Sequence, residues 1–434
     1  HGRSRSRAWP NPSLMVDILP ELGSDAMTED DPRKLEWMAG FPPPPDKIVR
    51  FRDGTYYQWP QMRWTFNHLP QLTPTKITWR GPGASRDLPS DPIDFSQTKI
   101  DLADGSSLSW TEMLESTHTD GLAVLHHGRL VYEEYFGGCG PHVHHTLMSC
   151  NKSMIGTVAE MMIHEGRLDD TALVPTIVPE LADSAWGDAT VRDVLDMVVS
   201  MVFHEDYMVP DSDVWKVVRS SGMAPLGPDD PPTIADFLPT VKKDRAHGEA
   251  FAYREPNIFA LGWIVRRAAN QDLATLASEM IWQHIGAEHD WLYMVDAGGA
   301  ENTASATLRD FLRFGELYVN RGVLDGKTIL PKPVIDAVLG GGDRAVFART
   351  AMETLPDWSF RSQWWYRHID GRTCPVARGA HGQFLYIDPV NELVIARFGS
   401  SPNAPSVLLD PILIPMIDSI TARISETSAG RSGA

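Results

Sequence analysis

The Ser-x-x-Lys pattern of Ser149 and Lys152 could supply a nucleophile and the base that activates it. On a helix, side chains three positions apart lie on one face, with Cβ atoms about 5–6 Å apart. The dipole and N–H groups of a first helical turn stabilise negative charge on the serine oxygen. A lysine kept neutral by burial or nearby positive charge could take the hydroxyl proton. The pattern therefore indicates nucleophilic catalysis.

The pattern is short, and a second copy occupies residues 96–99. Two prolines precede that copy and no helical period follows it, so its lysine need not face its serine. The copy at Ser149 instead opens a long amphipathic run after an expected strand and turn. We therefore expect Ser149 and Lys152 to be the functional pair. The alternative is a capping serine and a solvated lysine.

Two further segments could complete such a site. Tyr253 precedes an expected helix and could project into a cleft, where a nearby ammonium would lower the pKa of its phenol and allow proton relay. The glycine-containing segment 378–383 could bring an N–H group beside that of Ser149 as an oxyanion hole, worth roughly 3 kcal/mol per donor. A packing tyrosine and a simple bend before a strand are the ordinary alternatives.

Metal and cofactor binding are not expected. His142, His144 and His145 lie close together in sequence, but the stretch reads as a loop, without Asp or Glu at a helical ligand spacing. No glycine-rich fingerprint for a nucleotide or nicotinamide is present. The three cysteines are odd in number and share no CxxC spacing, which favours a reducing, cytoplasmic location over a disulfide scaffold.

Composition excludes several classes of partner. The chain has 434 residues, 42% of them apolar, as in a globular protein with a large core. Fifty-seven acidic against 39 basic residues give a net charge of −18, which disfavours nucleic acid and anionic lipid surfaces. No window approaches the roughly 20 apolar residues that span a bilayer. We expect a small-molecule substrate.

Hydrophobic patterning predicts two hairpins and three long helices. The hairpins cover residues 122–136 and 384–396, and both are expected in one sheet. The helices are expected over residues 148–166, 258–269 and 412–424. Strands near both ends of the chain, around a helical middle, indicate an α+β protein.

This order predicts two lobes and a leading segment. Residues 1–90 are proline-rich and are expected to form an extended segment wrapped on the body. Residues 91–148 and 300–434 are expected to form an α/β lobe with an antiparallel sheet flanked by helices. Residues 149–299 are expected to form a mostly helical lobe, with the active-site cleft between the two.

Taken together, Ser-x-x-Lys, the later tyrosine and the glycine-containing strand segment resemble the serine β-lactamase and penicillin-binding-protein superfamily. The chain is most similar to its nylon-oligomer hydrolase branch, the 6-aminohexanoate-dimer hydrolases. The similar stretches run in order from about residue 59 to beyond 400: 63–69, 147–153, 156–158, 164–169, 194–197, 205–207, Tyr253 with Asn257, 363–365, 381–383 and 388–389. Several independent stretches make a chance match improbable.

The resemblance implies a β-lactamase-like fold and a role for each matching residue. Ser149 would be the nucleophile, Lys152 the base, Tyr253 the proton relay to the leaving amine, and the N–H groups of Ser149 and Ala380 the oxyanion hole. The substrate would contact four further side chains, namely those of Tyr207, Asn257, Trp365 and His381. Hydrolysis of linear amides without a metal or cofactor would follow, and a homodimer is compatible with the family.

Departures from the branch bear on the substrate. Val218 stands where an acidic residue meets the substrate's amino end, and Ala297 stands where an asparagine is usual. The Lys-Thr-Gly strand motif of the wider superfamily becomes Ala377-Arg378-Gly379, so the cation that binds a β-lactam carboxylate is missing or is replaced by Arg378, which disfavours antibiotic hydrolysis. The chemistry also fits a carboxylesterase acting on short acyl esters. A non-catalytic binding protein that keeps the cleft is the remaining alternative.

Overall fold

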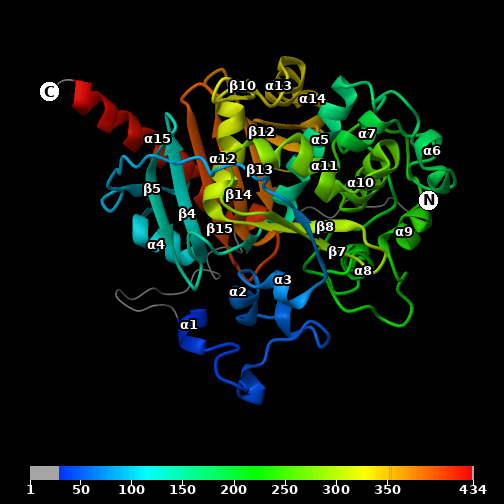
Figure 1. Ribbon diagram of the computed structural model, residues 1–434, viewed down its shortest axis with the longest axis horizontal. Helices are drawn as coiled ribbons and strands as arrows, with labels where there is room; N and C mark the ends of the chain where they lie inside the picture. Colours follow the sequence, from blue (N-terminus) through cyan, green and yellow to red (C-terminus); the bar gives the residue numbers. More distant parts are fainter. Residues whose placement is uncertain (1–28, 351, 353, 433–434) are drawn as a thin grey trace.

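A seven-stranded antiparallel sheet forms the centre of the molecule (Figure 1). The computed structural model describes residues 29–350, 352 and 354–432. The strands follow the spatial order β11 (Trp358–Arg361), β12 (Trp364–Ile369), β13 (Arg372–Gly379), β14 (Gln383–Asp388), β15 (Leu393–Gly399), β4 (Thr119–His126) and β5 (Arg129–Tyr135). The late strands are therefore joined to early ones through the pairing of β15 with β4.

Both faces of the sheet are covered. Along β4, Leu122 and Val124 point into one hydrophobic cluster, whereas Ala123 and Leu125 point into another. This alternation follows from the period of two in a strand. Helices α4 (Trp110–Ser116) and α15 (Asp410–Ser432) contribute to the first cluster, and α5 (Asn151–His164) and α12 (Leu308–Val319) to the second.

Most of the expected long elements are confirmed. The hairpins β4/β5 and β14/β15 lie in one sheet, as predicted. The helix expected to begin at residue 148 is α5, preceded by the 3-10 turn η4 (Met148–Cys150). Helix α10 (Pro256–Ala269) matches its prediction, and α15 extends beyond both ends of its predicted range. The α+β class is confirmed.

The region between Ser149 and residue 299 is mostly helical and lies beside the sheet (Figure 1). Besides α5 and α10, its helices are α6 (Val174–Ile177), α7 (Val191–Leu195), α8 (Asp213–Ser220), α9 (Ile234–Phe237) and α11 (Leu273–Met280), with 3-10 turns η5 (Pro179–Leu181), η6 (Leu238–Thr240) and η7 (Trp282–His284). After α12 come β9 (Val323–Leu324), β10 (Lys327–Thr328), α13 (Lys332–Leu339), α14 (Arg344–Phe347), η8 (Ala380–Gly382) and η9 (Ser406–Leu409).

A second sheet leads into the candidate site. Its order is β1 (Thr75–Thr78), β7 (Trp291–Val295), β8 (Glu301–Ala306) and β6 (His145–Thr146). Short β6 pairs with β8 and is followed directly by η4, which carries Ser149. The start of α5 is thus fixed by strand pairing on one side and by the core on the other.

The described part of the N-terminal segment differs from the expected extended chain. It forms short helices followed by the strand β1, the helices being α1 (Pro32–Leu35), η2 (Pro45–Lys47), η3 (Thr55–Tyr57), α2 (Gln61–Thr65) and α3 (Leu69–Leu72). Beyond this segment, β2 (Lys99–Asp101) pairs with β3 (Ser107–Ser109). Met62 and Phe66, four positions apart, are buried together. Helices this short show no repeated period in sequence, which is why the pattern predicted extended chain. The prediction for residues 1–28 lies outside the described residues.

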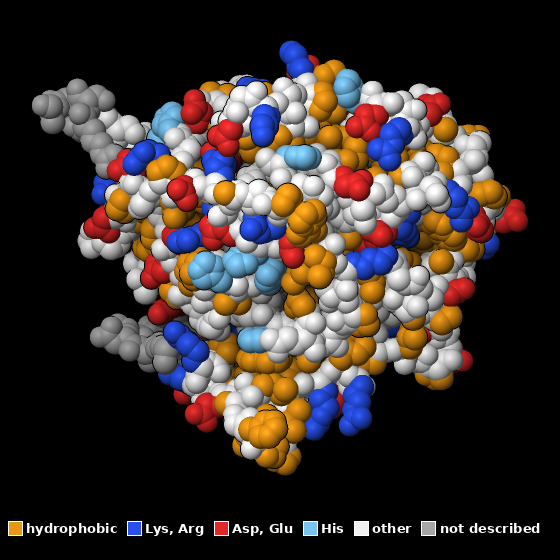
Figure 2. Space-filling view, viewed as in Figure 1, with side chains coloured by type: hydrophobic (Ala, Val, Ile, Leu, Met, Phe, Trp, Pro, Cys, Tyr) orange, Lys and Arg blue, Asp and Glu red, His pale blue; other side chains and the backbone are white. Residues whose placement is uncertain are grey.

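Acidic and basic side chains are interspersed over the face shown in Figure 2, among apolar residues and a group of histidines. None of the described helices is long and apolar enough to cross a membrane. The three cysteines are free thiols, and Cys150 and Cys374 are buried.

Candidate active site

Ser149 and Lys152 meet as the spacing predicted. Lys152 Nζ lies 2.8 Å from Ser149 Oγ and donates a hydrogen bond to it. Ser149 occupies the 3-10 turn η4 and Lys152 the first turn of α5, so a continuous helical path aligns the two side chains. The second Ser-x-x-Lys copy has no such alignment, because Ser96 lies in an exposed turn and Lys99 begins β2. The helical path that follows β6 therefore brings the serine and lysine of the first copy together, whereas the second copy lies outside any helix.

Glu255 is the third member of this group. Its carboxylate accepts from Lys152 Nζ through both oxygens, at 2.9 and 2.8 Å, and is 9% exposed. Burial alone would lower the pKa of Lys152, but the charge of Glu255, with smaller effects of Tyr253, outweighs it and holds that pKa above its ordinary value. The expectation of a neutral resting lysine is therefore wrong, because a buried carboxylate pairs with the ammonium.

Tyr253 lies beside the pair, with Lys152 Nζ 5.3 Å from its ring centroid. Burial raises the pKa of Tyr253 to about 12, despite the opposing charge of Lys152, and Glu255 adds to the rise. The predicted lowering of this pKa is therefore wrong. Interactions of the phenol with Ser149 and Lys152 oppose the rise only in part. The resting phenol is a proton donor rather than a base.

The segments carrying the expected oxyanion donors touch each other. A Cβ on Gly379 would lie 2.6 Å from the carbonyl oxygen of Leu147, so only glycine allows this approach. Ser149 and Ala380 each lie in the first turn of a 3-10 helix, where N–H groups lack partners within the helix. Met148 has φ 47° and His381 has φ 63°, so strained backbone flanks both donors.

Ser149, Lys152, Glu255 and Ala380 line one pocket, which encloses about 730 Å³ including its open mouth. Much of its wall is apolar, and the apolar residues are Met148, Ile155, Trp215, Val217, Val218, Met223, Ile258 and Phe259. Its polar residues include Asn151, Ser221 and Asn302. The Asn151 amide donates to the Asn302 carbonyl oxygen, and the Asn302 amide donates to the carbonyl and hydroxyl oxygens of Ser221. The nucleophile candidate therefore faces a mainly apolar chamber.

Asn151 leaves one acceptor unused in this wall. Its Nδ2 donates to the Asn302 carbonyl oxygen at 2.7 Å, which fixes the orientation of the amide. Its Oδ1 is buried and has no hydrogen-bond partner among the described residues. An unmet buried acceptor costs about 1–3 kcal/mol.

Tyr207 also lines the pocket, and its hydroxyl donates to Glu205 Oε1 at 2.9 Å. The other oxygen of Glu205 accepts the backbone N–H of Glu255 at 3.0 Å. Burial, followed by the charge of Glu255, raises the pKa of Glu205 to about 7. Lys152 therefore contacts the carboxylate of Glu255, and the backbone of Glu255 in turn contacts the carboxyl group of Glu205.

The proton on Glu205 gives a test of this arrangement. The folded protein holds it more tightly than an unfolded chain, in which the pKa is near 4.5. Its stabilising effect is thus fully present below about pH 4.5 and is lost as pH rises through 7. We expect Glu205→Gln, which cannot ionise, to gain stability relative to wild type between about pH 5 and pH 8 in thermal melts. Exposed Glu249→Gln is the control, and a pH-independent difference for Glu205→Gln would contradict the assignment.

Three predicted substrate contacts do not line this pocket. Asn257 is fully buried, and its Oδ1 accepts from the Trp186 indole at 3.0 Å. Trp365 stacks on Tyr253 with ring centroids 5.6 Å apart. His381 lies behind Tyr57, whose hydroxyl is 2.5 Å from its Nε2. These three side chains therefore support the wall or the Tyr253 ring rather than reach into the pocket.

Burial lowers the pKa of His381 to about 4, so the ring is neutral and holds Tyr57 in place. Arg378, the replacement for the motif lysine, donates to Asp410 at 2.5 Å and lies over the Trp358 and Trp365 rings. Its Nη1 is buried without a hydrogen-bond partner among the described residues, and Arg378 does not line the pocket. Val218 does line it, whereas Ala297 does not.

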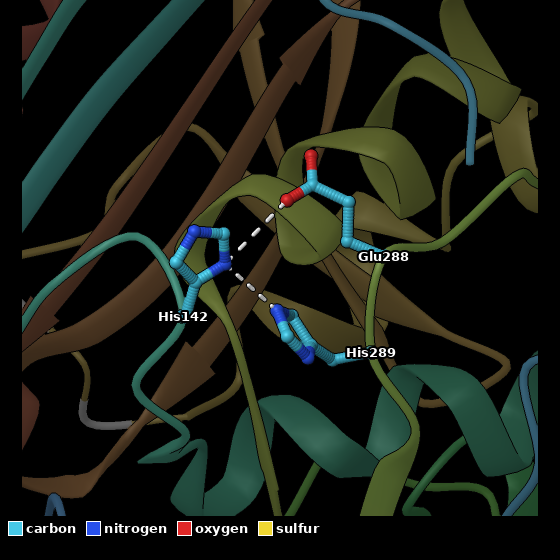
Figure 3. A group of neighbouring side chains, drawn as sticks. All are labelled: His142, Glu288 and His289. Atoms are coloured by element: carbon cyan, nitrogen blue, oxygen red, sulfur yellow. Dashed lines mark hydrogen bonds and ion pairs between the residues drawn. The ribbon is translucent and has the colours of Figure 1, made fainter.

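The histidine stretch separates into different environments. His145 is fully buried and bonds to Asp120 at 3.1 Å, and His144 Nε2 donates to the Asp290 carbonyl oxygen at 2.8 Å. His142 instead meets Glu288 and His289 from a distant part of the sequence (Figure 3). The acidic partner that helical spacing lacked is supplied by the tertiary fold.

No sequence pattern predicted Glu205 as a member of the site, and none predicted Glu255. Its position two residues after Tyr253, at the start of α10, was the available signal. No local signal connects Glu205 with Glu255, because their contact joins loops 50 residues apart.

A family model described as Beta-lactamase matches residues 111–414. The chain belongs to the beta-lactamase family. Within that family, this hydrolase is 33% identical to the 6-aminohexanoate-dimer hydrolase of Paenarthrobacter ureafaciens over 349 residues, which are 79% of the chain and 86% of that enzyme. The resemblance noted in the sequence is thus confirmed.

Solved structures agree. A Bacillus anthracis protein described as a candidate 6-aminohexanoate-dimer hydrolase superposes with a TM-score of 0.78 at 26% identity, covering 87% of this beta-lactamase family member and 99% of that chain. A class C beta-lactamase from Rhodobacter sphaeroides superposes at 0.51 with 15% identity, covering 72% and 98%, which shows a shared fold.

Proposed function

We propose that this hydrolase cleaves linear amides through an acyl-enzyme on Ser149. The observation that carries the proposal is the hydrogen bond from Lys152 to Ser149 inside an otherwise largely apolar pocket. Burying an ammonium group costs free energy. A buried ammonium 2.8 Å from a hydroxyl, at the wall of an open pocket, is therefore more typical of a functional site than of a structural one. The curated relative, named for hydrolysis of an amide dimer, supports the same chemistry.

In the first step Ser149 Oγ bonds to the substrate carbonyl carbon. Lys152 passes one ammonium proton to Glu255 and takes the Ser149 hydroxyl proton, so it remains charged. The carbonyl oxygen becomes negative against the N–H groups of Ser149 and Ala380, where fixed donors stabilise it most. Glu255 is thus the final proton acceptor, with Lys152 between it and the nucleophile.

In the second step the carbon–nitrogen bond breaks. Tyr253 gives its phenolic proton to the leaving nitrogen and recovers a proton from Lys152, which recovers one from Glu255. The amine leaves neutral and Ser149 is acylated. Water then attacks the ester along the same proton route, which releases a carboxylic acid and restores the Ser149 hydroxyl.

The pocket favours an amide with an uncharged chain. Asn151 lines the pocket, and its buried Oδ1 has no hydrogen-bond partner among the described residues, so a small rotation of this side chain would offer an acceptor to an amide N–H group, which an ester lacks. Val218 offers apolar surface and cannot pair with an ammonium, and the Glu301 carboxylate in the same wall is already paired with Lys76 and Arg266. We infer a linear acyl chain without a terminal charge as the preferred class, and the name of the curated relative suggests the length of the hexanoyl group as a starting point.

A matched substrate panel tests the proposal. Hexanoyl and 6-aminohexanoyl groups are each presented as p-nitroanilides and p-nitrophenyl esters. We expect turnover of hexanoyl anilide, with the 6-aminohexanoyl compound hydrolysed at least about tenfold more slowly. Ester cleavage without anilide cleavage would favour the esterase alternative. No cleavage of any compound would favour a binding protein.

Removal of the Glu255 charge should alter the pH dependence of the reaction. In Glu255→Gln, burial is no longer opposed, so the pKa of Lys152 should fall. We expect kcat to drop about 10–100-fold at pH 7 and to recover toward alkaline pH, where neutral lysine accepts the Ser149 proton directly. The pH–rate profile from pH 6 to about 10 is the measurement, with Glu249→Gln as control. An unchanged profile would exclude Glu255 from proton transfer.

A further inference from the structure

Two loops bring three metal-ligating side chains together on the surface, outside the pocket (Figure 3). His142 belongs to the loop between β5 and β6. Glu288 and His289 belong to the loop between η7 and β7. Because these segments are about 145 residues apart, only the tertiary fold creates the group.

The ligand atoms have spacings close to those of a tetrahedral centre. His142 Nδ1 lies 3.0 Å from His289 Nε2 and 3.9 Å from Glu288 Oε2. All three atoms lie within 4.8 Å of one another. Ligands at about 2.0–2.1 Å from a tetrahedral zinc ion are roughly 3.3 Å apart. Side-chain adjustments below about one ångström would therefore admit the ion.

The Glu288–His289 arm is held in place by buried groups. The backbone N–H groups of Glu288 and His289 donate to the two carboxylate oxygens of Asp310, at 2.7 and 2.9 Å. Arg313 donates to Glu288 Oε1 at 2.6 Å, and both Asp310 and Arg313 are almost fully buried. This leaves Oε2 as the oxygen that faces His142.

His144 restrains the neighbouring ring. Its ring packs edge-on against His289, with centroids 5.7 Å apart, and its own Nε2 is occupied by the Asp290 carbonyl oxygen. Such outer contacts orient ligating imidazoles in protein metal sites. His142 is the most exposed of the three, with 68% of its side chain exposed.

We propose that His142, Glu288 and His289 bind one zinc ion, with water completing the coordination. Two imidazole nitrogens and a carboxylate oxygen suit a borderline divalent cation better than calcium or magnesium. His142 Nδ1 and His289 Nε2 are 3.0 Å apart, with one proton between them in a hydrogen bond. The zinc ion would take the place of that proton and bond to the lone pairs of both nitrogens. The ion would join the chain leading to β6 and Ser149 to the loop before β7.

The site is independent of the proposed hydrolysis, so its test is a binding measurement. Zinc sulfate is titrated into the untagged full chain by calorimetry, and stoichiometry is read by native mass spectrometry. We expect one ion per chain with a Kd below about 100 μM. The melting temperature should rise by about 3 °C when free zinc is in large excess over Kd.

His142→Ala and His289→Ala should each weaken zinc binding at least about tenfold and remove the thermal shift. His142→Ala should fold normally, because that side chain is mostly exposed. His127→Ala is the matched control: His126, His127 and Glu392 are the same residue types in contact, but they do not form a candidate ligand set among the described residues. Absence of saturable binding, or binding that survives both ligand variants, would overturn the proposal.

Discussion

Ser149→Ala should lower turnover of hexanoyl anilide about 10⁴–10⁶-fold, because among the described residues Ser149 carries the one serine or threonine hydroxyl that accepts a hydrogen bond from Lys152. The remaining pocket would still bind substrate, so the loss should be in kcat rather than KM. Steady-state kinetics on wild type, Ser149→Ala and a control variant provide the measurement.

Ser96→Ala is the matched control, because it removes the serine of the second Ser-x-x-Lys copy, where Ser96 is exposed. It should leave kcat unchanged. A Ser149→Ala enzyme with more than about one hundredth of wild-type kcat would exclude the acyl-enzyme on Ser149. A thermal melt within a few degrees of wild type would show that the loss is chemical.

Lys152→Ala should lower kcat about 10²–10⁴-fold, the usual effect of losing a general base. It should also destabilise the fold, because Glu255 would be left buried without its cation, at a cost of about 3–5 kcal/mol. Kinetics together with thermal or denaturant unfolding separate the two effects.

The double variant Lys152→Met/Glu255→Gln distinguishes catalysis from folding. Replacing both charges should restore most of the stability lost in Lys152→Ala, because no buried charge remains unpaired. Activity should stay low. Recovery of activity along with stability would mean that Lys152 acts only as a structural partner, and Lys99→Ala in the second copy serves as the neutral control.

Local patterns predicted much of this molecule. The two hairpins followed from alternating residues around tight turns, and α5 and α10 from helical period, since these signals lie within a few residues. The Ser149–Lys152 contact followed for the same reason. It depends on one helical turn and not on distant packing.

The charge state of the site could not be predicted in this way. Lys152 was expected to be neutral, and the pKa of Tyr253 was expected to be lowered. The charge of Glu255 instead raises the pKa of Lys152, and burial raises the pKa of Tyr253. These effects depend on which loops meet at the start of α10. The substrate contacts assigned to Asn257, Trp365 and His381 failed to reach the pocket for a similar reason, since matching residues carry no information on side-chain direction.

The metal candidate shows the same limit. His142 had no acidic neighbour at a useful spacing in the sequence. In the structure it meets Glu288 and His289, which lie near the end of the region 149–299 in the sequence. Residue type was visible in the sequence, whereas convergence of two loops was not.

Mass spectrometry of the protein after reaction with a fluorophosphonate tests the central chemistry most directly. The predicted result is a single adduct, placed by peptide mapping on the serine at position 149, with labelling abolished in Lys152→Met/Glu255→Gln. An unmodified protein, or an adduct on a different side chain, would contradict nucleophilic catalysis by this serine.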